Sequence, residues 1–169
     1  MFEGSSGKIF TSCMTTSVRS SPQSHEELEN AVKNCRRLSP IGDCSTDAHG
    51  PMGGWDVSAV TDMHSIFSFA YAFNADITKW DVSAVTNMNR MFSFATAFNA
   101  DISKWDVSAV TDMSRMFYEA GAFNADISNW DVSAVTDMNN MFVKSSSFDQ
   151  VGGRVGYGIR VRQDFRDTH

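Results

Sequence analysis

The hydrophobic positions of this chain recur with a fixed period of 25 residues. Copies of Trp-Asp-Val-Ser-Ala-Val-Thr, uninterrupted by insertion or deletion, begin at Trp55, Trp80, Trp105 and Trp130. In the third copy, Trp105 and Val107 alternate with polar residues, as a short strand requires. The apolar spacing then changes to three and four residues from Val110 to Phe117, which is typical of one face of a helical turn. Each repeat is therefore predicted to contain a short strand, a turn and a short helical segment.

A unit of this size cannot bury its own apolar stripe, but stacked copies can. The opening I-x-x-W-x-V-x-x-V of each unit matches the leading pattern of a leucine-rich repeat. We therefore expect an α/β repeat fold, a right-handed leucine-rich-repeat-like solenoid with short helical turns and short parallel strands near 55–57, 80–82, 105–107 and 130–132. The tryptophans are expected in its core, as is the ladder of Phe73, Phe98, Phe123 and Phe148. The alternative for the tryptophans is an exposed ladder on which sugars stack.

The two ends of the chain depart from the repeat. Ser24 followed by Glu27 predicts a capped helix, which Pro40 ends and which could cover the first coil. After the repeats, apolar residues alternate with Gly and Arg from Val155 to Arg162, which indicates either a strand-like cap or a tail without structure. The expected divisions are a flexible segment at 1–23, a helical cap at 24–54, a solenoid of four repeats at 55–149, and this final segment at 150–169.

Charge narrows the classes of partner. The chain has a net charge of −6, and residues 51–150 contain 12 acidic and 5 basic residues. Nucleic acids are bound by basic surfaces, so we expect no nucleic-acid partner.

No apolar run approaches the ~20 residues of a membrane span, so no transmembrane segment is expected. The stretch from Met1 to Phe10 lacks the basic and then apolar layout of a signal peptide.

Cysteine and histidine spacing gives one structural candidate. Cys35 and Cys44 lie on the predicted helix and on the loop after it, so they are candidates for a disulfide. The alternative is that both are small buried residues in a reducing compartment. No zinc-ligand spacing links the cysteines with the four histidines. We expect no metal, no cofactor and no catalytic residues.

The repeat consensus W-D-V-S-x-V-T-x-M-x-x-M-F-x-x-A-x-A-F-N-x-D-I resembles the BspA-like class of leucine-rich repeats, and this resemblance covers residues 55–149. The segment before it resembles the amino-terminal cap of algal members of that class. The resemblance implies a module used for adhesion or protein binding, at the cell surface or after secretion, without common catalytic chemistry.

These observations favour a non-catalytic module that binds another protein, or adheres, through the polar face of its sheet. The alternative is a module that binds surface glycans.

Asp81 and its equivalents could bind Ca²⁺ through their oxygens, or could accept from the amide two residues later in a turn. The residues expected to contact the partner are Lys79, Asp81, Ser83, Lys104, Asp106, Ser108, Asn129 and Asp131.

Overall fold

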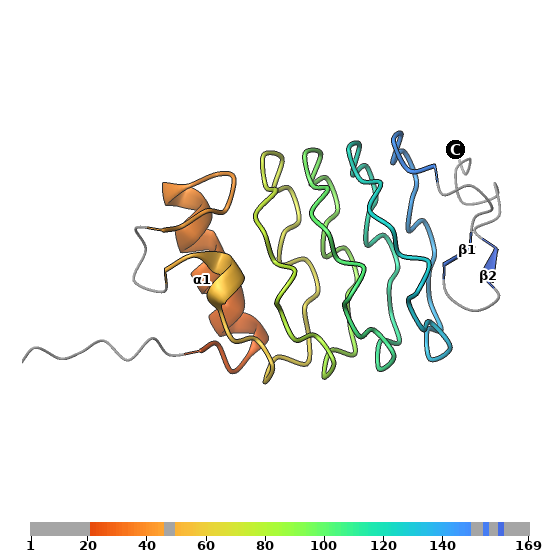
Figure 1. Ribbon diagram of the computed structural model, residues 1–169, viewed down its shortest axis with the longest axis horizontal. Coiled ribbons are helices and arrows are strands. Elements are labelled where there is room, and N and C mark those ends of the chain that lie inside the picture. The colour runs from red at the N-terminus through yellow and green to blue at the C-terminus, as the bar shows by residue number, and fades with distance from the viewer. Residues whose placement is uncertain (1–20, 46–49, 150–153, 156–158, 161–169) are drawn as a thin grey trace, which may run out of the picture.

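The computed structural model describes residues 21–45 and 50–149, together with the backbone at 154–155 and 159–160. Helix α1 (His25–Leu38) and the 3₁₀ turn η1 (Met52–Gly54) precede four coils that lie side by side in one stack (Figure 1). We call them coil 1 (55–79), coil 2 (80–104), coil 3 (105–129) and coil 4 (130–149).

The segments beyond this stack are described only in part. Strands β1 (Arg154–Val155) and β2 (Ile159–Arg160) pair antiparallel after coil 4. Otherwise, the expected flexible segment up to residue 20 and the expected cap or tail from residue 150 lie outside the described residues. Where the structure describes the chain, no helix is long and apolar enough to cross a membrane.

Helix α1 begins where its sequence predicts. The Ser24 side chain accepts the amide of Glu27 at 3.2 Å, and the Glu27 carboxylate accepts the amide of Gln23 at 2.7 Å. These bonds satisfy amides that have no partner within the helix. The apolar face of α1 is buried in the same core as the coils. A disulfide joins Cys35 of α1 to Cys44, with 5.3 Å between their Cα atoms, and ties the following loop to the helix.

Main-chain hydrogen bonds join each coil to the next. In coil 1, the amides of alternate residues from Met63 to Phe69 donate to carbonyls of coil 2 at 2.8–2.9 Å. The accepting carbonyls belong to Asn87, Asn89, Met91 and Ser93. In the opposite direction, each amide of Thr86, Thr111 and Thr136 donates to the threonine carbonyl 25 residues earlier, at 2.8 Å. Isolated parallel bridges accompany these bonds at Asp62, Asn87, Asp112 and Asp137.

Other amides of this stretch close tight turns within the coil. Ile66 donates to the carbonyl of Met63, and Ala70 donates to that of Phe67. The third residue of each turn has a positive φ, 57° at Ser65 and 56° at Phe69. This is the geometry of a type II turn, in which glycine is preferred and other residues cost about 1–2 kcal/mol. Non-glycine residues occupy the same turn position in the later coils at Arg90, Phe94, Arg115, Glu119, Asn140 and Lys144.

The predicted fold class, a right-handed α/β leucine-rich-repeat-like solenoid with short strands and short helical turns, is wrong. From residue 55 to 149 the chain forms turns and isolated bridges, with no helix or extended strand. The predicted strands fail because the Asp in each one accepts the amide of the Ser two residues later, which turns the backbone. In coil 1, Asp56 accepts from Ser58, and Val60 donates to Val57 in the next turn. The predicted helical segments are replaced by the type II turns.

The predicted positions of the tryptophans in the core are confirmed. The four side chains are 1–7% exposed. Each indole nitrogen donates to a main-chain carbonyl, and the acceptors are Gly50, Met52, Ile77 and Ile102. These contacts satisfy the polar group of the buried ring and exclude the tryptophans as a sugar-stacking platform. Phenylalanine rings stack within each coil and between coils, as at Phe92, which lies 3.9 Å from Phe98 and 5.6 Å from Phe117 between ring centroids.

Replacing Trp105 by alanine is expected to cost about 3–5 kcal/mol of unfolding free energy, because it leaves a cavity between neighbouring coils. Trp105→Phe is the matched control. It keeps an aromatic ring and removes only the indole hydrogen bond to the carbonyl of Ile77, which still accepts the amide of Trp80, so its loss should be smaller. Urea unfolding followed by the fluorescence of the other tryptophans measures both variants. A loss below about 1 kcal/mol for Trp105→Ala would contradict the core assignment.

Candidate binding surfaces

The first aspartate column consists of one exposed residue per coil, Asp56, Asp81, Asp106 and Asp131. In coil 2, the Asp81 carboxylate accepts the amide of Ser83 at 3.0 Å and its hydroxyl at 2.6 Å. The same two contacts recur at Asp106 with Ser108. Hydrogen bonds from the hydroxyl and the amide of Ser83 hold the pKa of Asp81 below its usual value, although Asp106 and Asp56 repel its charge. Each carboxylate is thus held in place yet open to solvent.

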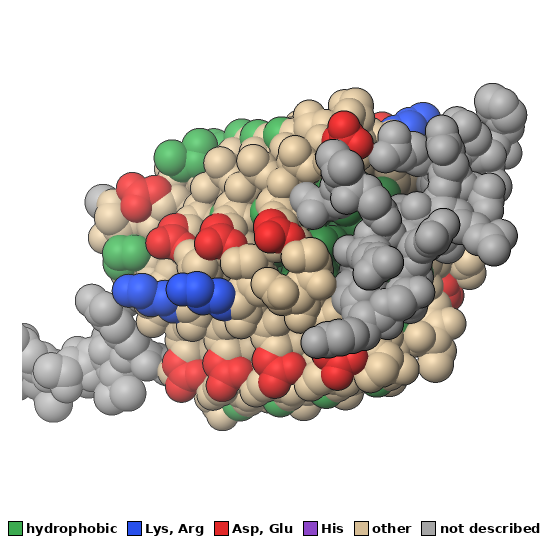
Figure 2. All heavy atoms as spheres, turned by 45° about the vertical axis from the view of Figure 1, so that its right-hand side comes forward, with side chains coloured by type: hydrophobic (Ala, Val, Ile, Leu, Met, Phe, Trp, Pro, Cys, Tyr) green, Lys and Arg blue, Asp and Glu red, His purple; other side chains and the backbone are tan. Residues whose placement is uncertain are grey.

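The second aspartate column, Asp76, Asp101 and Asp126, is built in the same way. Its carboxylates accept the amides of Thr78, Ser103 and Ser128. Hydrogen bonds from the Thr78 hydroxyl and amide lower the pKa of Asp76, and the charge of Lys79 adds to this effect. Lys104 acts likewise on Asp101. We call the two columns with Lys79 and Lys104 the charged face; Figure 2 shows rows of acidic side chains with basic side chains between two of them.

The structure places all the predicted contact residues at the surface. Exposed side chains are found at Lys79, Asp81, Ser83, Lys104, Asp106, Ser108, Asn129 and Asp131. They do not lie on a sheet, because the expected strands are absent. Of the two roles considered for the aspartates, the structure shows the turn acceptor, which uses one carboxylate oxygen and leaves the other free of described partners.

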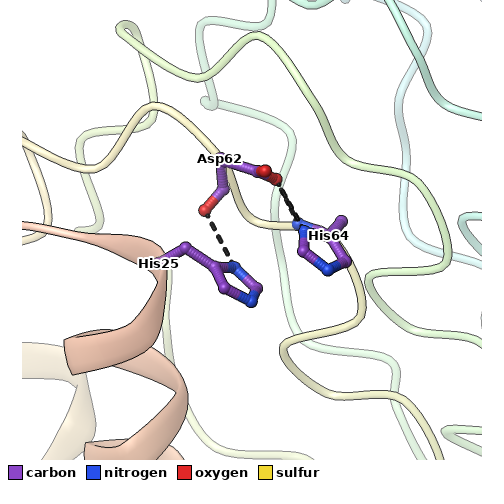
Figure 3. A group of neighbouring side chains, drawn as sticks. All are labelled: His25, Asp62 and His64. Carbon is purple, nitrogen blue, oxygen red and sulfur yellow. Dashed lines mark hydrogen bonds and ion pairs between the residues drawn. The ribbon is translucent and has the colours of Figure 1, made fainter.

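A second cluster joins α1 to coil 1 and was not found in the sequence. The rings of His25 and His64 stack with centroids 4.0 Å apart and planes inclined by 8° (Figure 3). Nδ1 of His25 lies 3.3 Å from the main-chain oxygen of Asp62, and Nδ1 of His64 lies 3.0 Å from the Asp62 carboxylate. Burial opposes ionisation of Asp62, but hydrogen bonds from His64 and the charges of both histidines lower its pKa overall.

This cluster fits an anchor better than a metal site. One ligand atom from each of the three residues lies within 4.8 Å of the others. A metal ion binds an imidazole nitrogen in the plane of its ring, and two stacked rings inclined by 8°, with centroids 4.0 Å apart, do not direct their nitrogens at one common point. Both Nδ1 atoms face acceptor oxygens, so each is the donor, and the contacts fasten the first turn of α1 to coil 1.

The arginine groove is a hollow of about 640 Å³ between α1 and the turns of coils 1–3. Glu29, Lys33 and Arg36 line it from α1. The coils contribute polar and basic residues to one wall and aromatic residues to another. The lining residues from the coils are Ser65, Ile66, Ser68, Phe69, Arg90, Ser93, Phe94, Arg115 and Tyr118. The aromatic rings continue from one coil to the next, with Phe69 and Phe94 stacked at 4.7 Å and Phe94 and Tyr118 edge-on at 5.4 Å.

The groove is basic, although the chain as a whole is acidic. Its only acidic lining residue, Glu29, is paired with Lys33 at 2.8 Å. Arg36 donates to the carbonyl of Phe69 at 3.0 Å, while its Nε is buried and has no hydrogen-bond partner. Across the described part of the chain, no carboxylate forms an ion pair with Arg36, Arg90 or Arg115. Three cations around one hollow therefore have no acidic partner among the described residues.

Both clusters depend on how α1 lies against coil 1, which the repeat pattern does not encode. One signal was present in the sequence. His64 stands where the other coils have Asn89, Ser114 and Asn139, and Arg90 and Arg115 stand where coil 1 has Ser65. Departures from an otherwise regular repeat mark positions that the stacking does not dictate.

Comparison with known proteins identifies a family. The family described as "Mycoplasma protein of unknown function, DUF285" matches residues 27–154, and the chain belongs to this family. No curated protein and no solved structure matches the chain.

Acidification is expected to destabilise the fold below about pH 4. The folded-state pKa values of Asp81 and Asp106 lie below the unfolded ones, so their contribution is complete above the unfolded pKa and is lost as the pH falls through the folded pKa. Urea midpoints measured from pH 7 to pH 2 check this. The double variant Asp81→Asn/Asp106→Asn should lose less stability on acidification, because an amide oxygen accepts at every pH. An equal loss in both proteins would contradict this role.

Proposed function

We propose that this DUF285 chain is a non-catalytic module that binds another protein through its charged face. The proposal rests on one observation: charged side chains recur along the stack, and hydrogen bonds hold them in place. Seven exposed carboxylates in two columns are each held by the amide two residues later. Side chains that are already ordered lose little entropy on binding, so they form a favourable interface.

The charge pattern indicates the chemistry of the partner. Two acidic columns flank Lys79 and Lys104, so a complementary surface carries basic side chains in two rows with acidic groups between them. Such complementarity raises the rate of encounter and rejects wrong partners more than it raises affinity. At the end nearest α1, the face borders a hollow of about 410 Å³ lined by Ile41, Asp76 and Lys79 among others, and Ile41 is 57% exposed. This residue offers an apolar anchor beside the charges.

The resemblance of the repeat motif to BspA-like surface proteins also supports a binding or adhesion role. The alternative of a glycan-binding module requires exposed aromatic rings. Because the tryptophans are buried, that function would fall to Phe69 and Tyr71, which are 54% and 57% exposed. These rings lie on coil 1 only, whereas the charged face extends over all four coils. Protein binding is therefore the function that the surface favours.

The double variant Asp81→Asn/Asp106→Asn tests the charged face. Asn87 already accepts the amide two residues later, at 2.9 Å, so asparagine preserves this kind of turn while removing the charge. We expect the variant to melt close to the native temperature. The immobilised wild-type chain should retain partner proteins at low salt and release them as salt rises, and the immobilised variant should not retain them.

The matched control is Arg90→Gln/Arg115→Gln, which alters charges on the arginine groove and should still retain the proteins that the Asp81→Asn/Asp106→Asn variant loses. Crosslinks from the captured partner are expected at Lys79 and Lys104. Identical capture by the wild type and by the Asp81→Asn/Asp106→Asn variant, with crosslinks elsewhere, would contradict the proposal.

A further inference from the structure

The main chain of coil 1 presents carbonyl groups towards α1 that lack their usual donors. In coil 2, the carbonyls of Met91 and Ser93 accept amides from coil 1. The equivalent carbonyls of coil 1 belong to Ile66 and Ser68, and no coil precedes them. Helix α1 supplies a donor at the first carbonyl of this row, His25 for Asp62, and Arg36 donates to the carbonyl of Phe69, the residue that follows the row. Among the residues that the structure describes, nothing donates to the carbonyls of Ile66 and Ser68.

These two carbonyls belong to residues that line the arginine groove. They are two residues apart, which is the spacing at which an extended peptide presents amides along one edge. Main-chain carbonyls along a free edge are acceptors, and an added strand is a common way to satisfy such an edge. The edge therefore fits an extended peptide that takes the place of a preceding coil.

The walls of the groove define the side chains of such a peptide. Arg90 and Arg115 project from consecutive coils, and no described carboxylate pairs with either. Guanidinium groups bind carboxylates in a bidentate manner. Phe69 and Phe94 form a stacked pair beside them, and Phe69 is 54% exposed. An occupant with carboxylates and one apolar or aromatic side chain would complement both walls.

We propose that the arginine groove binds an extended acidic peptide segment of a partner protein. Its main-chain amides donate to the carbonyls of Ile66 and Ser68, its carboxylates pair with Arg90 and Arg115, and an aromatic side chain packs on Phe69 and Phe94. This site is separate from the charged face and does not depend on the function proposed for that face.

A single-stranded nucleic acid is the other class of ligand that arginines and aromatic rings attract. Its phosphates are acceptors and supply no donor for the two carbonyls. A long polyanion would also meet the acidic surface of this chain beyond the groove. The carbonyl row therefore favours a peptide, and the two classes can be separated experimentally.

The probe is a fluorescein-labelled short peptide with aspartates and glutamates on both sides of a central phenylalanine. Its binding to the full chain is measured by fluorescence anisotropy. Three unlabelled competitors are used: the same peptide with Asn and Gln in place of the acids, the same acidic peptide with N-methylated main-chain amides, and oligothymidylate. We expect the unlabelled parent peptide to displace the probe. At the same concentrations, none of the three competitors should displace it.

The variant Arg90→Gln/Arg115→Gln is expected to weaken probe binding about tenfold or more with unchanged melting. Lys79→Gln/Lys104→Gln is the matched control, because it removes the same charge from the charged face and should leave probe binding unchanged. Three results would overturn the proposal: absence of saturable probe binding, an equal loss in both double variants, or displacement by oligothymidylate. Displacement by the N-methylated peptide would overturn the role of the carbonyl row.

Discussion

The rest of this structure depends on how the main-chain amides divide between acceptors in the neighbouring coil and acceptors in their own coil. From Met63 to Phe69, and at the equivalent residues of the next coils, every second amide donates to the neighbouring coil. The amides between them donate within the coil, to main-chain carbonyls in tight turns or, at His64, to the carboxylate of Asp62. A chain that alternates in this way is neither a strand nor a helix, yet its amides in this stretch have acceptors. The stack gains its cohesion from this ladder and from the buried aromatic rings that the ladder aligns.

A directional ladder leaves its two ends chemically different. From Met63 to Phe69 the amides of coil 1 donate to carbonyls of coil 2, so the equivalent carbonyls of coil 1 form a row that no coil satisfies. Helix α1 covers this end, and it does so with side chains as donors rather than with a main chain. His25 and Arg36 each supply a donor, while the carbonyls of Ile66 and Ser68 have none among the described residues. Capping by a helix thus creates the groove, because side-chain donors reach only part of the row.

The sequence predicted the parts of the fold that depend on burial and missed those that depend on main-chain partners. The period, the tryptophan core and the capped start of α1 follow from apolar spacing and capping chemistry, which are local signals. Strand and helix were wrongly predicted because the same spacing also fits a succession of turns. The turn in which Asp81 accepts the amide of Ser83 is one of the two roles that the Asp-x-Ser spacing predicts, and it prevents the expected strand. Positive φ at Arg90 and Arg115 carries no glycine signal, so the type II turns could not be read from composition.

The candidate surfaces differ in how far the sequence could reveal them. The charged face repeats with the period, so every predicted contact residue is exposed. The arginine groove combines residues of α1 with turn positions whose identity changes from coil to coil. Ser65, Arg90, Arg115 and Asn140 occupy equivalent turn positions with the same backbone conformation. Because the fold accepts serine, arginine and asparagine at this position, stacking does not fix the side chain, which can vary to suit a ligand. Specificity is therefore more readily encoded along the turns, whereas the aspartate columns, which also hold the coils in shape, supply a general electrostatic attraction.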